Sequence, residues 1–284
     1  MNQATREPED VPATSRRRRI LALVAERGFV SIQELSRLFE VSVVTIRSDV
    51  DRLAERGELR RIRGGVMDAR RSGLERPFEE TATAQAEEKA AIGRAVAAVV
   101  QPGETVVLDV GTTTTAVARA LLQRRELDGV TVVTNGLTIA TELEDALDRF
   151  TVMLTGGTLR RLQHSLVDPM GDLLLDRLHA DLAVIGCNGV DPLAGVTNVN
   201  LPEVSMKQRM LRSGRRRIVV ADGSKIGLVS LGLVCSPADL DLIVTGQSAP
   251  EDVLERLAAQ HVHVDVVASL PEAAPPIALS APPA

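Results

Sequence analysis

Residues 31–66, SIQELSRLFEVSVVTIRSDVDRLAERGELRRIRGGV, limit the possible folds of this chain more than any other segment. Their pattern predicts two short helices joined by a tight turn, followed by a basic β-hairpin. Ser31 can cap the first helix, and Glu34, three residues later, can complete a capping box. The apolar face of this helix is predicted to consist of Ile32, Leu35 and Leu38.

The second helix of this segment is predicted to follow Val41, which closes the turn, and Ser42, which can cap the helix. Apolar residues recur at i, i+4 and i+7 and should face inward, at Ile46, Val50 and Leu53. The opposite arc, with Arg47 on its flank, holds Val44, Thr45, Ser48, Asp51 and Arg52. Gly57 is expected to end the helix.

Basic residues around these two helices favour DNA as the partner. Residues 58–67 place arginines around a Gly64-Gly65 turn, which is a wing suited to the phosphate backbone, and residues 16–26 can supply a third helix. Helices packed in this way can set the second one into a major groove. The predicted DNA-binding residues are Ser31, Ser42, Val44, Thr45, Arg47, Ser48, Arg52, Arg60, Arg61 and Arg63. The alternative is a small helical bundle with a solvated charged face.

The distribution of charge along the chain supports DNA binding more than the total charge does. The chain as a whole carries a formal net charge of −5. Residues 15–71 contain 14 Arg against 8 Asp and Glu, whereas residues 72–284 contain 18 Lys and Arg against 27 Asp and Glu. A basic module joined to an acidic body is typical of a DNA-binding domain attached to a domain with another task.

Composition indicates a cytoplasmic protein without a membrane partner. No stretch approaches the roughly 20 apolar residues of a membrane span, and no secretory signal is visible. Cys187 and Cys235 are expected to be reduced, and the four histidines show no metal-ligand spacing, so neither a metal nor a cofactor is expected. The predicted organisation is a disordered tail at 1–14, a DNA-binding domain at 15–70, a linker at 71–85, a second domain at 86–270 and a disordered tail at 271–284.

The second domain alternates short apolar runs with helical patterns. Candidate strands are 105–110, 130–134, 151–155, 182–186, 217–221, 241–245 and 263–268. Candidate helices lie near 86–100, 115–124, 137–146, 169–178, 202–213 and 251–259. Val-, Ile- and Leu-rich strands separated by helices predict an α/β fold, Rossmann-like, with a mostly parallel sheet covered on both faces.

The loops after the predicted strands are rich in glycine and threonine. They are DVGTTTT, opened by Asp109, then TNG at 134–136, TGG at 155–157, GCNG at 186–189 and DGSK at 222–225. Glycine permits close approach of the backbone to a ligand, and a helix N-terminus favours a negative group. One such loop is often only a turn or a cap. Five at corresponding strand ends favour a binding site for a small phosphorylated ligand.

The small numbers of lysine and aromatic residues narrow the class of ligand further. Against 30 Arg, the chain has only three lysines, at 89, 207 and 225. Lys225, in a strand-end loop beside Asp222, suits a phosphate or hydroxyl group, and an ordinary surface lysine is the alternative reading for all three. The chain has no Trp or Tyr, and none of its four Phe lies in a strand-end loop. A sugar or polyol phosphate is therefore favoured over a nucleobase.

At residues 16–246 the chain resembles the DeoR family of bacterial transcriptional regulators. In the first domain the resemblance lies in V-S-x-x-T-I-R-x-D at 41–49, Leu53, Gly57 and R-x-x-G-G at 61–65. In the second it lies in RPF at 76–78, EK at 88–89, D-x-GTTT at 109–114, TN at 134–135, GG at 156–157, the region of Lys207, and D-x-SK at 222–225. Ser48, Arg63 and Thr245-Gly246 depart from the usual Arg, His and Thr-Asp of the family.

The resemblance implies a winged helix-turn-helix followed by a sensor domain related to ribose-5-phosphate isomerase and CoA-transferase folds. It implies a repressor of a carbohydrate uptake or catabolism operon, released from double-stranded operator DNA by a phosphorylated sugar. Carried over by position, the effector-binding residues are Gly111, Thr112, Thr113, Thr114, Asn135, Gly156, Gly157 and Lys225, beside Asp109. A homo-oligomer, dimer or tetramer, is expected because paired heads read paired half-sites.

Two other functions remain open from the sequence. One is a sugar-phosphate isomerase with an appended DNA-binding head, which would need a carboxylate base near the substrate carbon. Its candidate bases are Asp109, Asp191, Glu203 and Asp222. The other is an architectural DNA-binding protein without an effector.

Overall fold

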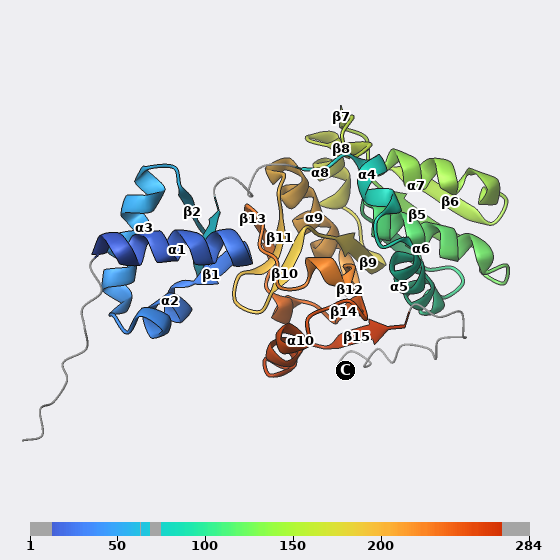
Figure 1. Ribbon diagram of the computed structural model, residues 1–284. Coiled ribbons are helices and arrows are strands. Elements are labelled where there is room, and N and C mark those ends of the chain that lie inside the picture. The colour runs from blue at the N-terminus through green and yellow to red at the C-terminus, as the bar shows by residue number, and fades with distance from the viewer. Residues whose placement is uncertain (1–12, 63, 69–74, 269–284) are drawn as a thin grey trace, which may run out of the picture. The chain divides into compact units, whose positions relative to one another are not determined.

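The computed structural model describes residues 13–62, 64–68 and 75–268. Two compact units make up the chain, Met1–Gly73 and Leu74–Ala284 (Figure 1). Each unit has a hydrophobic core of its own. Arg63 and the predicted tail at 271–284 lie outside the described residues. Ala13 and Thr14, which were predicted to belong to the first tail, instead begin a helix.

The first unit is a trihelical core with a three-stranded antiparallel sheet. Its elements are α1 (Ala13–Arg27), β1 (Phe29–Ser31), α2 (Ile32–Phe39), α3 (Val43–Glu55), β2 (Leu59–Ile62) and β3 (Gly65–Asp68), with strand order β1-β3-β2. The inward positions predicted for the second helix are confirmed: Ile46, Val50 and Leu53 are at most 2% exposed. Gly57, with a φ of 70°, follows the end of α3 as predicted.

Two details of α2 differ from the prediction. Leu38 is 48% exposed, because Leu35 and Phe39, one helical turn apart, face the core in its place. The capping box forms only in part. Ser31 Oγ accepts a hydrogen bond from the backbone N of Glu34 (3.0 Å), but the Glu34 carboxylate accepts from Arg27 (2.7 Å). The charge of Glu34 thus ties α2 to the end of α1.

A seven-stranded parallel sheet forms the centre of the second unit, in the order β15-β14-β12-β9-β4-β5-β6. The strands are β4 (Thr105–Leu108), β5 (Val130–Thr134), β6 (Phe150–Leu154), β9 (Ala180–Gly186), β12 (Gly214–Val220), β14 (Leu242–Gly246) and β15 (Val264–Val267). Each of the seven predicted ranges overlaps one of these strands, so the predicted fold class is confirmed. The strand order reverses between β4 and β9.

Alternate residues of the strands enter two separate cores, one on each face of the sheet. Val106 and Leu108 pack into one core with helices α5 (Ala86–Ala98) and α6 (Thr112–Gln123). Val107 packs into the other, with α9 (Leu201–Ser213) and α10 (Glu251–Ala258). Two further helices of this unit are α7 (Leu137–Glu142) and α8 (Met170–Leu175). Helices therefore cover both faces, as expected for a parallel sheet.

Several short elements were not predicted. They are helix α4 (Phe78–Thr83), the hairpin β7 (Thr158–Arg160) and β8 (Ser165–Val167), and a small antiparallel sheet of β10 (Gly189–Asp191), β11 (Gly195–Asn198) and β13 (Gly232–Cys235). Strands of three or four residues are too short to show a periodicity. Helix α4 lies inside the segment that was predicted to be a linker.

Candidate functional sites

The exposed face of α3 presents most of the predicted DNA-binding residues. Arg47, Ser48 and Arg52 are exposed, and Val44 is 74% exposed. Thr45 is half-buried, and its backbone N and hydroxyl both contact Ser42 Oγ (3.1 and 2.8 Å). An apolar, a hydroxyl and a guanidinium group thus lie together in the first turns of the helix. These are the kinds of side chain that read base edges in a major groove.

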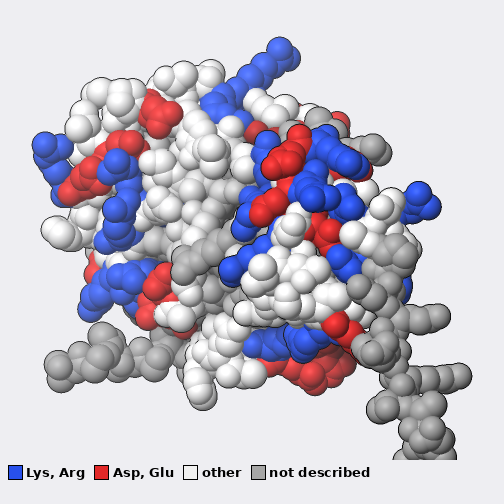
Figure 2. Space-filling model, turned by 90° about the vertical axis from the view of Figure 1, so that its left-hand side faces the viewer, with Lys and Arg blue, Asp and Glu red and all other residues white. Residues whose placement is uncertain are grey.

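Ser31 is placed as a helix cap and not as a DNA contact. Its side chain is 3% exposed, and its hydroxyl oxygen accepts the hydrogen bond from Glu34. On the wing, the β2–β3 hairpin, Arg60 and Arg61 are exposed. Arg61 forms an ion pair with Asp51, which joins the wing to α3. Figure 2 shows basic side chains interspersed with acidic ones, and within the described residues Arg47, Arg52 and Arg60 form no ion pair.

A buried ion pair in this unit was missed by the sequence reasoning. Asp49 is 5% exposed and accepts a hydrogen bond from Arg16 Nε (2.6 Å), with Arg17 Nε at 3.3 Å. It fixes α1 to α3. Its position between the inward residues Ile46, Val50 and Leu53 was the available signal. Part of the basic run at residues 16–19 is therefore structural.

In the second unit, the first strand-end loop becomes the start of a helix. Gly111, with a φ of 144°, is the N-cap of α6, and Thr112 begins the helix three residues before the predicted start. The Thr114 and Thr115 hydroxyls both donate to the Gly111 carbonyl (2.9 and 2.7 Å), so neither proton is available to a ligand while those bonds persist. No side chain caps the first N–H groups of α6, which is a geometry that binds anions.

Two further loops lie at the same carboxyl edge of the sheet, after β5 and β6. Asn135 is fully buried; its Oδ1 accepts from Val110 N (2.8 Å) and its Nδ2 donates to Leu166 O (3.3 Å), so it holds the loops in place. Gly156 and Gly157 have φ values of 71° and 124°. A Cβ at Gly157 would lie 2.8 Å from the Asp168 carbonyl oxygen, so only glycine fits there.

The three lysines differ sharply in environment. Lys225, in the turn Gly223–Lys225, is half-buried, and its ammonium has no hydrogen bond or ion pair within the described residues. Lys89 and Lys207 are 4% and 2% exposed, so the surface-lysine reading is wrong for both. Lys89 Nζ donates to the carbonyls of Thr81 and Ala84 and lies 4.0 Å from Asp222. Burial lowers the pKa of Lys89.

Asp109 and Lys207 form a buried ion pair where the strand order reverses. Asp109 Oδ2 also accepts from Gly186 N (3.0 Å), at the end of β9, so one carboxylate joins two neighbouring strand ends. Burial raises the pKa of Asp109 to about 6, although Lys207 opposes the shift. Asp109 and Glu203 outweigh the effect of burial on Lys207 and raise its pKa. Asp109 Oδ1 is buried without a hydrogen-bond partner in the described structure.

The four candidate bases of the isomerase alternative are all engaged in other contacts. Asp191 accepts from the backbone N of Leu193 and Ala194 (both 2.8 Å). Glu203 accepts from Arg160, Ser165 and Asn198. Asp222 accepts from Ser224, and Asp109 is paired with Lys207. Carboxylates held in this way act as caps and ion-pair partners, which does not favour a catalytic base.

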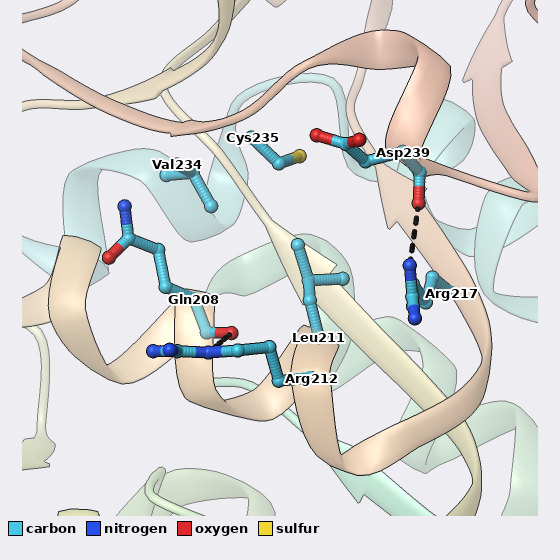
Figure 3. A pocket seen from close by; sticks show the side chains of 7 residues that line it. All are labelled: Gln208, Leu211, Arg212, Arg217, Val234, Cys235 and Asp239. Atoms are coloured by element: carbon cyan, nitrogen blue, oxygen red, sulfur yellow. Dashed lines mark hydrogen bonds between the residues drawn. The ribbon is translucent and has the colours of Figure 1, made fainter.

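A separate cavity of about 260 Å³ lies between α9, β12 and β13 (Figure 3). None of the predicted effector residues lines it. Gln208, Leu211 and Arg212 of α9 face Arg217, Val234, Cys235 and Asp239 across it. In the described part of the chain, no group of three or more His, Cys, Asp or Glu side chains could hold a metal ion. No helix among the described residues is long and apolar enough to cross a membrane.

Known proteins match this chain along most of its length. Similarity to solved structures is low: ribose 5-phosphate isomerase A of Methanocaldococcus jannaschii aligns at 15% identity over 50% of this chain and 55% of that one, with a TM-score of 0.37. The HTH-type regulator YgbI of Escherichia coli strain K12 is 36% identical over 86% of this chain and 94% of that protein. The glycerol-3-phosphate regulon repressor of the same strain is 31% identical over 89% and 98%, and the regulator GlpR of Haloferax volcanii is 33% identical over 88% and 96%.

Family models give the same assignment for each unit. The DeoR-like helix-turn-helix domain matches residues 16–70, and the DeoR C terminal sensor domain matches residues 84–247. The two matches follow one another in the order in which the winged unit and the parallel-sheet unit occur. The chain belongs to the DeoR family of DNA-binding transcriptional regulators.

Proposed function

We propose that this protein represses an operon for carbohydrate uptake or catabolism and leaves its operator when a phosphorylated sugar binds the sensor unit. The observation that carries the proposal is the carboxyl edge of the sheet. There an uncapped helix N-terminus, two positive-φ glycines and an unpaired lysine follow the ends of β4, β6 and β12, which alternate with β5 and β9 in the sheet. Relatives named as repressors of the glycerol-3-phosphate regulon support the same class of effector.

In this proposal, α3 reads the operator and the wing contacts phosphates. Arg47 suits the acceptor pair of guanine, and the exposed Val44 suits the 5-methyl group of thymine. Arg52 and Arg60 would contact the backbone and supply salt-dependent affinity without sequence preference. Ser48 and Arg63, which depart from the usual family residues, would give this protein an operator of its own.

The effector would bind by its phosphate to the N-terminus of α6 and to Lys225. The N–H groups of Thr112 to Thr114 and the hydroxyls of Thr112 and Thr113 are the donors that remain, with Gly156 and Gly157 allowing close approach. Asn135 and Asp109 would hold the loops in place. We expect a homo-oligomer that acts in the cytoplasm on paired half-sites, separated by about one helical turn or a multiple of it.

The test starts from the purified full-length protein. Its operator is selected from random double-stranded DNA, and release is measured against inorganic phosphate, glycerol 3-phosphate, ribose 5-phosphate, fructose 6-phosphate and fructose 1-phosphate. One sugar phosphate should weaken operator binding by about 5- to 150-fold. If none shifts the melting temperature or the affinity for DNA, the sensor function is wrong. Turnover of any of these compounds would instead support the isomerase alternative.

A further inference from the structure

We propose that Arg160 couples the effector loops to the segment that leads into the DNA-binding unit, through an ion pair with Glu75. This inference rests on the proposed function, because it assigns the residues by which effector binding would be transmitted. Glu75 is the second residue of the sensor unit, and the chain leads from there towards the DNA-binding unit. Nothing in the DNA-reading face or in the phosphate-binding loops requires this pair.

Arg160, at the end of β7, lies between two carboxylates. Its Nη1 donates to Glu203 and to Glu75 Oε1 (3.3 Å), and its Nη2 donates to Glu75 Oε2. The three side chains are 18%, 5% and 12% exposed for Arg160, Glu203 and Glu75. A two-pronged guanidinium–carboxylate contact that is largely removed from water is directional. Arg160 therefore fixes both the position and the orientation of Glu75.

The residues after Glu75 are attached to the same hairpin by several further contacts, among them the approach of His164 Nε2 to Glu79 Oε1 (3.2 Å). Phe78 N donates to Leu162 O (2.9 Å), and Gln163 Nε2 donates to Arg76 O (2.6 Å). The His164 ring stacks on Phe78 with 5.4 Å between ring centroids. The start of the second unit's chain is thus held by the β7–β8 hairpin. Any displacement of the hairpin must move this segment or break these contacts.

The opposite side of the hairpin is attached to two of the proposed effector loops. Leu166 N donates to Asn135 O (2.8 Å), and Leu137 N donates to His164 O (2.9 Å). Gly157 directly precedes β7 and packs against the carbonyls of Val167 and Asp168. A ligand bound at Gly156 and Gly157 therefore lies three or four residues from Arg160 along a strand. The hairpin therefore connects these effector loops to Glu75.

Glu203 links this connection to the buried ion pair as well. Its Oε1 accepts from Ser165 Oγ (2.9 Å), the residue that pairs with Arg160 across the hairpin. One turn further along α9, Lys207 pairs with Asp109 beside the first effector loop. Both ends of the effector site thus reach Arg160, one through the hairpin and one through α9. The ion pair with Glu75 then passes the displacement to the start of the sensor unit, from which the chain leads to the DNA-binding unit.

Glu75→Gln is the decisive variant, because it keeps the shape of the side chain and leaves Arg160 paired with Glu203. Operator affinity is measured with and without the sugar phosphate that releases the wild type, and affinity for that compound is measured by calorimetry. We expect each separate affinity to stay within about threefold of wild type, while the wild-type release factor of about 5- to 150-fold falls below about threefold. Arg160→Lys, which keeps the charge but loses the two-pronged contact, should have a release factor between those of wild type and Glu75→Gln.

Glu142→Gln is the matched control, because it removes an Arg–Glu pair between α6 and α7, Arg119–Glu142, that does not touch Glu75. It should release normally. Normal release by Glu75→Gln would overturn the proposal, and so would equal losses of release in Glu75→Gln and Glu142→Gln. A wild type that responds to none of the compounds would instead refute the proposed sensor function. If Glu75→Gln does not fold, Arg160→Lys is the test, and a release factor equal to that of wild type would overturn the proposal.

Discussion

In the DNA-binding unit the described arginines of α3 and the wing lie at the surface, whereas the sensor unit buries several of its charged groups against one another. Arg47, Arg52 and Arg60 are exposed and form no ion pair within the described residues. Asp109 and Lys207, by contrast, are 0% and 2% exposed and paired. Exposed charge remains available to a partner molecule, while buried charge holds the protein's own elements together.

The physical reason for this difference is the cost of removing charge from water. A buried charge must be paired, and removing one partner leaves the other uncompensated. An exposed arginine stays hydrated in the free protein, so it remains available to bind a phosphate group. Asp49 with Arg16 shows that the first unit also contains one buried pair. Buried, paired charges and exposed, unpaired charges therefore occur side by side within one unit as well as in different units.

The largest effect is expected for Lys207→Met. This change leaves the Asp109 carboxylate buried without its cation, at a cost of about 3–5 kcal/mol in the free energy of unfolding. Urea unfolding of the full chain measures this cost. Arg119→Met, which removes an exposed partner of Glu142, should cost less than about 1 kcal/mol. Similar losses in both variants would remove the distinction between buried and exposed charge.

The pH dependence of stability tests the same pair. Burial raises the pKa of Asp109 from 3.8 to about 6, so the native protein holds this proton at pH values where the unfolded chain has lost it. Its stabilising contribution is present below pH 3.8 and is lost as the pH rises through about 6. The stability of wild type relative to Asp109→Asn should fall by up to about 1.4 kcal/mol per pH unit in this interval. A difference that rises with pH would mean that the Asp109 pKa is lowered.

Lys225→Ala tests whether an unpaired lysine in the sensor unit binds the effector. Operator affinity should remain unchanged, while the sugar phosphate concentration needed for release should rise by about 10- to 100-fold, through loss of one charged hydrogen bond. Release is followed by fluorescence anisotropy of labelled operator. Lys225→Arg keeps the charge, so the sugar phosphate concentration that it needs for release should lie between those of wild type and Lys225→Ala. A normal response from Lys225→Ala would exclude this lysine from the site.

Arg47→Ala tests base reading by the exposed face of α3. Affinity for the selected operator should fall by about 10- to 100-fold, because a base contact is worth about 1–3 kcal/mol. Affinity for unrelated DNA should fall much less. Arg52→Ala is the control, and it should weaken both DNAs alike and reduce the salt slope by about one. Equal losses on both DNAs for Arg47→Ala would make Arg47 a phosphate contact.

The smallest effect is expected for Val44→Ala. If the exposed Val44 contacts a thymine methyl group, the variant should lose about threefold in operator affinity, or less than 1 kcal/mol. Replacing the contacted thymine by deoxyuridine should weaken wild type by the same factor and leave Val44→Ala unaffected. Additive losses would show that the methyl group and the side chain do not touch. Leu38, which is exposed on α2, provides the control: Leu38→Ala should lose the same factor as wild type when deoxyuridine replaces the thymine.

The strands of the sensor unit were predictable because a strand that is buried on both faces of a sheet has a nearly continuous apolar sequence. Seven Val-, Ile- or Leu-rich runs became seven parallel strands. The start of α6 was less predictable, because four threonines are poor helix formers on their own. In the folded protein, the hydroxyls of Thr114 and Thr115 bond back to the Gly111 carbonyl and allow the helix to begin at Thr112.

The sequence alone determined the family, the winged reader and the strand-end loops, because each rests on local spacing that a single segment carries. It did not determine which charges would be buried. Lys207 and Asp109 are 98 positions apart in the chain, and Arg160 and Glu75 are 85 positions apart. A local sequence pattern therefore cannot predict either pair. Only the tertiary structure brought these residues together, by aligning the strand ends at one edge and folding the β7–β8 hairpin over the start of the sensor unit.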